Sequence, residues 1–176
     1  MKEELEALLK AHTWDLVDLP PGKSAIGSGY VYKMKTRANG EIERYKARLV
    51  ALGSNQEYGI DYEETFAPVA RITYVRSLLA IAVSRNWDLF QMEVKNAFLH
   101  GNLQEEVYMR PPPDYDHPPN KVYRLRRALY GLKQAPRAWF SKFSSTVCNF
   151  GFQQVLMIMP CLFDTPARVA SSYFFM

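Results

Sequence analysis

The sequence is poor in the residues that build disulfide frameworks and histidine-based sites. Its two cysteines, Cys148 and Cys161, are too few for a disulfide scaffold and are not spaced as metal ligands, so we expect an intracellular protein, cytoplasmic or nuclear. The three histidines, His12, His100 and His117, are scattered along the chain. That scatter argues against a Ser–His–Asp or Cys–His catalytic site.

Long apolar runs are missing as well. No stretch is long and apolar enough to span a bilayer, and the chain opens with a polar segment and not with a leader peptide, so we expect no membrane partner. Apolar residues nevertheless make up 48% of the sequence, which is enough to form a core and excludes the disordered class. We therefore expect a globular unit, or a fragment of one, near the size of a single domain.

Charge is segregated along the chain although the net charge is only +4. Six basic residues lie between Lys33 and Arg48, and seven lie between Lys121 and Lys142, where no acidic residue occurs. Such segregation favours a surface that meets phosphate groups. Solvated strand and helix faces remain the alternative interpretation of the same pattern.

Hydrophobic periodicity and turn signals predict an α+β fold. Helices are expected at residues 1–11, 73–85 and 136–150, and strands at residues 14–19, 29–36, 42–51, 88–94, 107–109 and 122–125. Thr73 is the expected N-cap of its helix. The expected buried stripes are Val75, Leu78, Leu79 and Ala82 in the second helix, and Trp139, Phe143, Val147 and Phe150 in the third.

A hairpin is the clearest local feature of the sequence. Asn39-Gly40 separates the predicted strands at residues 29–36 and 42–51, and both residues tolerate the positive φ of a tight turn. Alternation along the second strand puts Arg44, Lys46 and Arg48 on one face. The hairpin is therefore expected to project basic side chains together.

One carboxylate and one loop could carry chemistry. Glu93 ends the apolar strand predicted at residues 88–94, where it is either a ligand for a hard cation or a strand-end residue that reaches solvent. The loop at residues 129–135 contains Gly131 and opens a helix, with Lys133 and Arg137 near the helix N-terminus, where anions bind favourably. An ordinary loop and helix cap is the alternative there.

Five ordered segments resemble one known family. They are residues 14–17, 43–51, 59–69, 94–101 and 130–139, and the likeness extends over residues 2–152. Their sequences resemble the reverse transcriptase domain of copia-type (Pseudoviridae-like) LTR-retrotransposon Pol polyproteins. The resemblance implies an RNA-directed DNA polymerase with the fingers and a partial, ferredoxin-like palm of a right-hand fold, and no thumb.

The same resemblance implies roles for individual residues. Glu93 matches the first metal-binding and catalytic aspartate, and Mg²⁺ or Mn²⁺ is the implied cofactor. Lys133 and Arg137 are implied to bind nucleic acid. The residues implied to bind the nucleotide are Lys46, Arg48, Lys95, Asn96, Ala97, Phe98 and Gln134. The implied partners are an RNA or DNA primer–template, a dNTP, and the integrase and RNase H segments of a full-length polyprotein.

Two departures from the family pattern predict an inactive chain. Glu93 stands where the family has aspartate, and the sequence contains no Asp-Asp pair to complete a two-metal site. Residues 1–152 are expected to form a partial reverse transcriptase domain, and residues 153–176 a degenerate or frame-shifted tail. The alternatives to an enzyme are a non-catalytic nucleic-acid-binding remnant and a product of a degenerate element without a selected function.

Overall fold

The computed structural model describes residues 2–91, 93–112 and 117–150. Contacts divide the chain into two compact units: a larger unit of Met1–Phe66 and Asn96–Phe143, and a smaller unit of Ala67–Lys95 and Ser144–Met176. The predicted tail at residues 153–176 and the part of the predicted apolar strand at Met92 lie outside the described residues. The described residues combine three α-helices with antiparallel strands, so the α+β class is confirmed.

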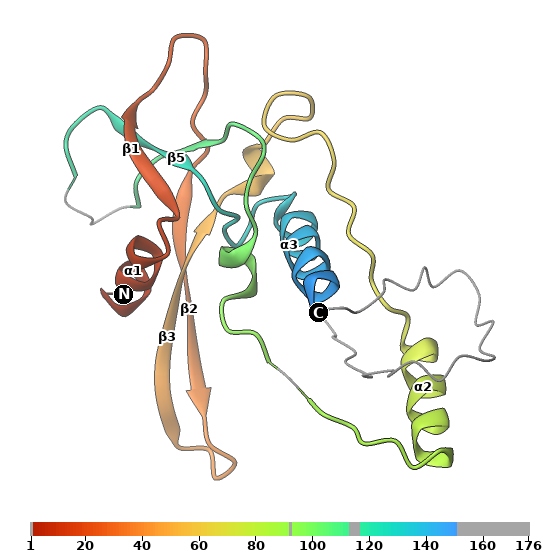
Figure 1. Cartoon of the computed structure of the whole chain (residues 1–176). Helices are drawn as coiled ribbons and strands as arrows, with labels where there is room; N and C mark the ends of the chain where they lie inside the picture. Colours follow the sequence, from red (N-terminus) through yellow and green to blue (C-terminus); the bar gives the residue numbers. More distant parts are fainter. Residues whose placement is uncertain (1, 92, 113–116, 151–176) are drawn as a thin grey trace. The chain divides into compact units, whose positions relative to one another are not determined.

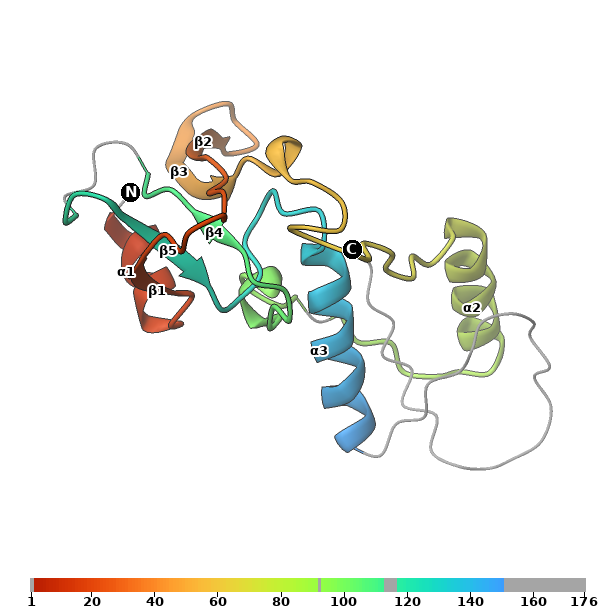
Figure 2. The same cartoon turned by 90° about the horizontal axis from the view of Figure 1, so that it is seen from above.

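A three-stranded antiparallel sheet lies in the larger unit, in the order β1 (Trp14–Asp18), β5 (Lys121–Leu125), β4 (Tyr108–Met109). Figure 2 shows the three strands side by side. The Trp14 ring stacks on Tyr123 across the β1–β5 pair, with ring centroids 4.4 Å apart. The sheet thus joins two segments that are about a hundred residues apart in the sequence, and aromatic stacking reinforces their pairing.

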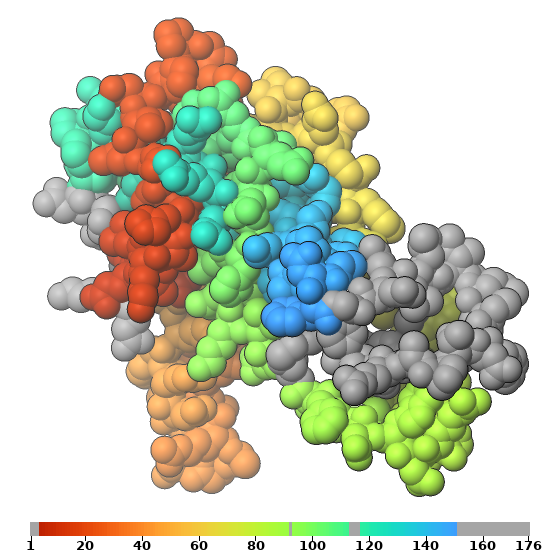
Figure 3. Space-filling model, viewed as in Figure 1, coloured from red at the N-terminus to blue at the C-terminus, as the bar shows by residue number. Residues whose placement is uncertain are grey.

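The predicted hairpin is confirmed by β2 (Ser28–Thr36) and β3 (Ile42–Ala51), which pair antiparallel. Gly40 has φ +85°, and the Asn39 side-chain carbonyl accepts a hydrogen bond from the Glu41 amide at 3.1 Å. These two features close the turn locally. The far end of the hairpin, in orange, protrudes from the rest of the larger unit in the space-filling view (Figure 3).

Helix α1 (Lys2–Lys10) packs against β3. Leu8 and Leu49 are both fully buried, one on the helix and one on the strand. The Leu8 carbonyl at the end of the helix accepts hydrogen bonds from the Thr13 hydroxyl at 2.8 Å and from the Thr13 amide at 3.1 Å. Helix α1, strand β3 and the three-stranded sheet therefore share one core. Figure 1 labels α1, β3 and two strands of the sheet, β1 and β5. Its most deeply buried members are Leu8, Leu49, Val107, Met109, Ala128 and Leu129.

The loop after residue 129 lies against the end of β3 at unusually close range. The Tyr130 carbonyl accepts a hydrogen bond from the Ala51 amide at 2.8 Å. A Cβ placed on Gly131 would lie 2.1 Å from the Ala51 carbonyl oxygen, and one on Gly53 would lie 2.0 Å from the Gly131 carbonyl oxygen. Only glycine allows this approach, because any side chain would overlap backbone atoms that cannot move aside.

Two short helices and the first part of α3, up to Phe143, complete the larger unit. The 3₁₀ helix η1 (Gly53–Asn55) follows β3, and η2 (Ala97–His100) follows Asn96. Helix α3 (Ala135–Asn149) begins where the sequence predicts it, one residue before Pro136. Its Trp139 is buried as expected, whereas Phe150, just beyond its last turn, is 79% exposed, so the prediction that Phe150 is buried was wrong.

The described part of the smaller unit contains α2 (Ile72–Ser84). The N-cap is Arg71 and not Thr73, and it makes no side-chain capping bond. Val75 and Ala82 are buried as predicted, but Leu79 is 46% exposed. The prediction that Thr73 is the N-cap was therefore wrong: the helix begins at Ile72, and the Arg71 carbonyl accepts its first hydrogen bonds, from the Tyr74 and Val75 amides. No described helix is long and apolar enough to cross a membrane.

The strand predicted at residues 88–94 is absent from the described positions of that range. Residues 88–91 and 93–94 have no regular secondary structure, and Phe90 is 80% exposed. An apolar run predicts a buried strand only where a neighbouring strand accepts its backbone hydrogen bonds. No described strand pairs with this segment, so its apolar residues alone did not make it a strand.

Gly131→Ala should lower the free energy of unfolding by about 3 kcal/mol or more, because it combines a strained positive φ with a backbone clash. Gly40→Ala is the matched control: its φ is similar, +85° against +91°, but nothing lies within 4 Å of its added Cβ. The control should cost only about 1 kcal/mol. Urea unfolding measures both, and equal losses for the two variants would contradict the close approach of loop and strand.

Candidate functional site

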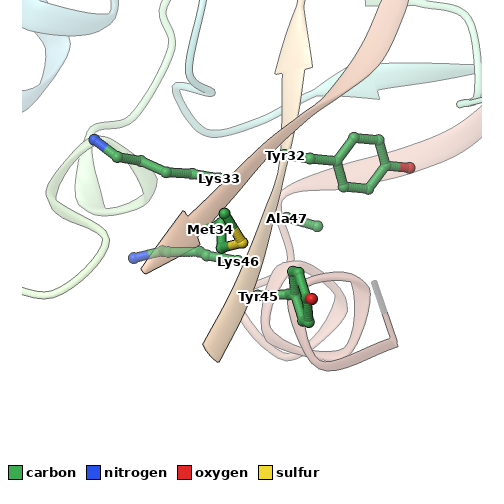
Figure 4. Close-up of a pocket in the computed structure, with 6 residues that line it drawn as sticks. All are labelled: Tyr32, Lys33, Met34, Tyr45, Lys46 and Ala47. Carbon is green, nitrogen blue, oxygen red and sulfur yellow. The ribbon is translucent and has the colours of Figure 1, made fainter. Parts of the chain in front are cut away.

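The hairpin separates two kinds of side chain, as its alternation predicted. Lys33 pairs with Lys46 and Lys35 with Arg44, and directly paired residues project from the same side of a sheet. In Figure 4 the Lys33 and Lys46 side chains lie on one side of the strands, and Tyr32 lies on the other. We call the basic side, formed by Lys33, Lys35, Arg44, Lys46 and Arg48, the basic face.

The residues of the basic face form no salt bridge in the part of the chain that the structure describes. Neither Lys46 nor Arg48 has an acidic oxygen within 4 Å among the described residues. Burial lowers the pKa of the Lys46 ammonium, and the nearby charges of Arg48 and Arg44 lower that pKa further. Like charges held together in this way favour the binding of an anion, which would offset their repulsion.

The Glu4 carboxyl on α1 interacts electrostatically with both Lys46 and Arg48. Burial raises the pKa of the Glu4 carboxyl, while a hydrogen bond from the Leu49 amide and the charges of Arg48 and Lys46 oppose that rise. The pKa remains raised, so the cost of burying the carboxylate exceeds the attraction of the two cations.

Arg48, Phe98 and Tyr130 meet at the inner end of the basic face. The Arg48 guanidinium lies over the Tyr130 ring, 4.9 Å from its centroid. The Phe98 ring contacts the same tyrosine edge-on, with centroids 5.0 Å apart and the ring planes at 68°. Three segments with predicted site residues, β3, η2 and the loop before α3, thus converge on Tyr130.

Tyr130 was missed as a site residue by the sequence reasoning, which selected Gln134 from the same loop. The available signal was its place immediately before Gly131, where a hinge residue allows close backbone contact. Nothing local in the sequence indicates that Arg48 and Phe98 reach the same ring. That contact follows from the Ala51–Tyr130 hydrogen bond, which brings the end of β3 to the loop.

Gln134 is fully buried and its amide is used within the protein. Its Nε2 donates to the Asp61 carbonyl at 3.0 Å, and its Oε1 accepts from the Gln56 Nε2 at 3.0 Å. The Gln56 Oε1 in turn accepts from the Lys133 amide at 2.9 Å. These bonds fasten the irregular segment at residues 53–62 to the loop before α3, so the amide of Gln134 is not presented to solvent.

Lys133 and Arg137 also have protein partners. The Lys133 ammonium donates to the Gln56 carbonyl at 3.1 Å and lies 4.8 Å from the centroid of the Tyr62 ring. Arg137 forms a salt bridge with Glu105. Both side chains retain further donors, since an ammonium carries three and a guanidinium five. Their role in binding nucleic acid stays a prediction.

The segment that carries Glu93 belongs to two different units. Glu93 and Lys95 lie in the smaller unit, whereas Asn96, Ala97 and Phe98 lie in the larger one. Glu93 is exposed, which agrees with the alternative that its carboxylate reaches solvent, although the strand expected around it is absent from the described positions. Asn96 has φ 52° and starts η2, which puts Ala97 in its first turn.

No metal cluster is found in the described part of the chain. No group of three or more His, Cys, Asp or Glu side chains gathers there. An open hollow of about 430 Å³ lies on the hairpin between Tyr32, Lys33, Met34, Tyr45, Lys46 and Ala47 (Figure 4). The Arg48–Tyr130–Phe98 contact lies outside this hollow.

Comparison with known proteins identifies the family. A family model described as reverse transcriptase (RNA-dependent DNA polymerase) matches residues 11–164. The chain belongs to this family of reverse transcriptases. The match extends beyond residue 152, where the sequence reasoning ended the domain, although that boundary stays a prediction. No solved structure matches the chain.

Curated relatives place this reverse transcriptase chain with the copia-type retrotransposons. The retrovirus-related Pol polyproteins from transposons RE1 and RE2 of Arabidopsis thaliana are each 47% identical to it over 156 residues, or 86% of the chain. The corresponding polyprotein from transposon TNT 1-94 of Nicotiana tabacum is 46% identical over 147 residues, or 82% of the chain. The aligned part is only 11% of the length of each relative.

Gln134→Ala and Gln56→Ala should each lower the free energy of unfolding by about 2 kcal/mol, because each leaves a buried polar partner unsatisfied. The double variant should lose less than the sum, since both changes break the same hydrogen bond. Urea unfolding measures the cycle, and Gln104→Ala, an exposed glutamine of the same unit, is the control. Additive losses would show that the two amides act independently.

Glu4→Gln should stabilise the fold at neutral pH. A raised carboxyl pKa means that the contribution of Glu4 to stability is fully present below its ordinary pKa of 4.5 and is lost as the pH rises. The gain should therefore shrink as the pH is lowered toward 4.5, when urea unfolding is followed over a pH series. Glu6→Gln removes the same charge from an exposed position of α1 and should change stability less. A loss of stability at neutral pH would instead mean that the attraction of Arg48 and Lys46 for the Glu4 carboxylate exceeds the cost of burying it.

Proposed function

We propose that the larger unit binds the incoming nucleotide and the template strand in a reverse transcriptase that copies RNA into DNA as part of a longer Pol polyprotein. The observation that carries the proposal is the contact of Arg48 and Phe98 with one tyrosine, at the end of a basic face that forms no salt bridge among the described residues. Lys46 and Arg48 meet the triphosphate in this proposal. Phe98 meets the sugar, where it excludes a 2′-hydroxyl.

Electrostatics supports this division of roles. The Arg48 side chain is held by a ring and not by a carboxylate, so its charge remains available to an anion. A triphosphate would relieve the repulsion that lowers the pKa of Lys46. Lys33, Lys35 and Arg44 extend the same face along the hairpin and match the charge of a nucleic-acid backbone.

The finer architecture of the proposal is that of a right-hand polymerase. We propose that the β2–β3 hairpin belongs to the fingers and that the remaining elements supply part of the palm. Gln134 contributes through the loop that it holds, since its hydrogen-bonding groups are occupied by Gln56 and Asp61. Lys133 and Arg137 lie on this loop and on the first turn of α3, and they meet phosphates with their remaining donors.

The described residues do not by themselves fit a two-metal site for Mg²⁺ or Mn²⁺. Glu93 is exposed, and no cluster of three or more potential ligands accompanies it in the part of the chain that the structure describes. Phosphoryl transfer with paired metals needs several carboxylates in one place. Catalysis therefore requires carboxylates besides Glu93, and nucleic-acid binding without catalysis is the second candidate function of these residues.

Charge reversal of Lys33 and Arg44, two exposed residues of the basic face that match the nucleic-acid backbone, tests the binding proposal. The full chain should bind a primer–template duplex without sequence preference, with an affinity that falls as salt rises. The double variant Lys33→Glu, Arg44→Glu should bind more weakly and reduce the slope of log K against log salt by about 2, one for each lost phosphate contact. Fluorescence anisotropy over a salt series measures the slope.

The control for charge reversal is Lys10→Glu with Arg124→Glu. It changes the net charge by the same amount at two exposed positions outside the hairpin. Its slope should change less than that of the hairpin variant. Equal slopes for the two double variants would mean that net charge alone governs binding. If the chain without substitutions does not bind the duplex, the binding proposal is wrong.

A further inference from the structure

Tyr130 occupies a position that the proposed function does not use directly. Its ring is half-buried and contacts a guanidinium on β3 and an aromatic ring on η2. The proposed function assigns phosphate binding to Arg48 and sugar selection to Phe98. Both side chains therefore contact one residue, Tyr130, although their tasks differ.

The backbone of Tyr130 is fixed by the core on both sides. Leu129 before it is fully buried, and Gly131 after it lies so close to Ala51 that no Cβ fits. The Tyr130 carbonyl accepts the Ala51 amide hydrogen bond at 2.8 Å. The ring is thus attached to a tightly constrained backbone, whereas the Arg48 side chain has several rotatable bonds of its own.

Arg48 depends on this ring for its position. Its buried Nε has no hydrogen-bond partner in the described structure, and no carboxylate within 4 Å holds its guanidinium. The contact with the Tyr130 ring is therefore the principal interaction that restricts where the guanidinium lies. Phe98 contributes an edge to the same ring, so a shift of the tyrosine would move both neighbours.

We infer that Tyr130 is a positioning residue that holds Arg48 and Phe98 in a set arrangement, and so couples triphosphate affinity to selection of a deoxyribose sugar. The inference rests on the proposed function, because it assigns those two tasks to Arg48 and Phe98. The aromatic face and not the hydroxyl group carries the role, since both contacts are made with the ring.

Three variants of the full chain separate this role from a general effect on folding. Tyr130→Leu should weaken the binding of dATP with Mg²⁺ about threefold to tenfold and should lower the preference for dATP over ATP. Tyr130→Phe keeps the ring and should retain both properties. Trp87→Leu, which removes a cation–π pair with Arg85 in the smaller unit, should leave both unchanged.

A spectroscopic measurement tests the position of Arg48 without any nucleotide. Protons held over an aromatic ring are shifted upfield in the NMR spectrum, so the Arg48 side-chain protons should be shifted in the unchanged chain and in Tyr130→Phe. The shift should be lost in Tyr130→Leu. Thermal unfolding of each variant shows whether it is folded under the conditions of the binding measurement.

The outcomes distinguish this inference from the function on which it rests. Binding that weakens with Arg48→Ala but not with Tyr130→Leu would overturn the positioning role and leave the proposed function standing. Absence of dATP binding by the unchanged chain would overturn the proposed function and the coupling together. Weaker binding and reduced sugar preference in Tyr130→Leu, both restored in Tyr130→Phe, is the result expected.

Discussion

The arrangement of the larger unit depends on the contact between the end of β3 and the loop before α3. Ala51 and Gly131 approach so closely that only glycine fits at position 131, and Gly53 is restricted in the same way on the other side. One hydrogen bond, from the Ala51 amide to the Tyr130 carbonyl, completes the contact. Because β3 carries the basic face and the loop carries Tyr130, this backbone contact determines which side chains can meet.

Two polar features extend from that contact, and they differ in kind. The Gln56–Gln134–Asp61 network is closed: its donors and acceptors satisfy one another, which makes it a device for holding a loop. The basic face is open, since the charges of Lys46 and Arg48 repel each other and have no carboxylate partner within 4 Å among the described residues. A surface that binds phosphates needs both properties, a rigid support and charge left for the ligand.

Local patterns predicted the elements that depend on local causes. The Asn39-Gly40 hairpin and the start of α3 at Pro136 follow from turn and helix-start preferences, and the structure contains both. The strand at residues 88–94 was predicted from apolar composition alone, and it failed because a strand also needs a partner. The exposure of Leu79 and Phe150 has the same origin, since periodicity names a face without specifying what covers it.

Family membership was recognisable from the sequence, because five segments resemble the family in the same order along the chain. The comparisons confirm it. The sequence also determined that Arg44, Lys46 and Arg48 share a face, since alternation along a strand is a local property. Only the tertiary structure decided that Arg48 and Phe98 meet at Tyr130, and that Gln134 is buried within the protein. These contacts join residues that are far apart in the sequence, 32 positions for Phe98 and Tyr130 and 82 for Arg48 and Tyr130, and no local pattern encodes them.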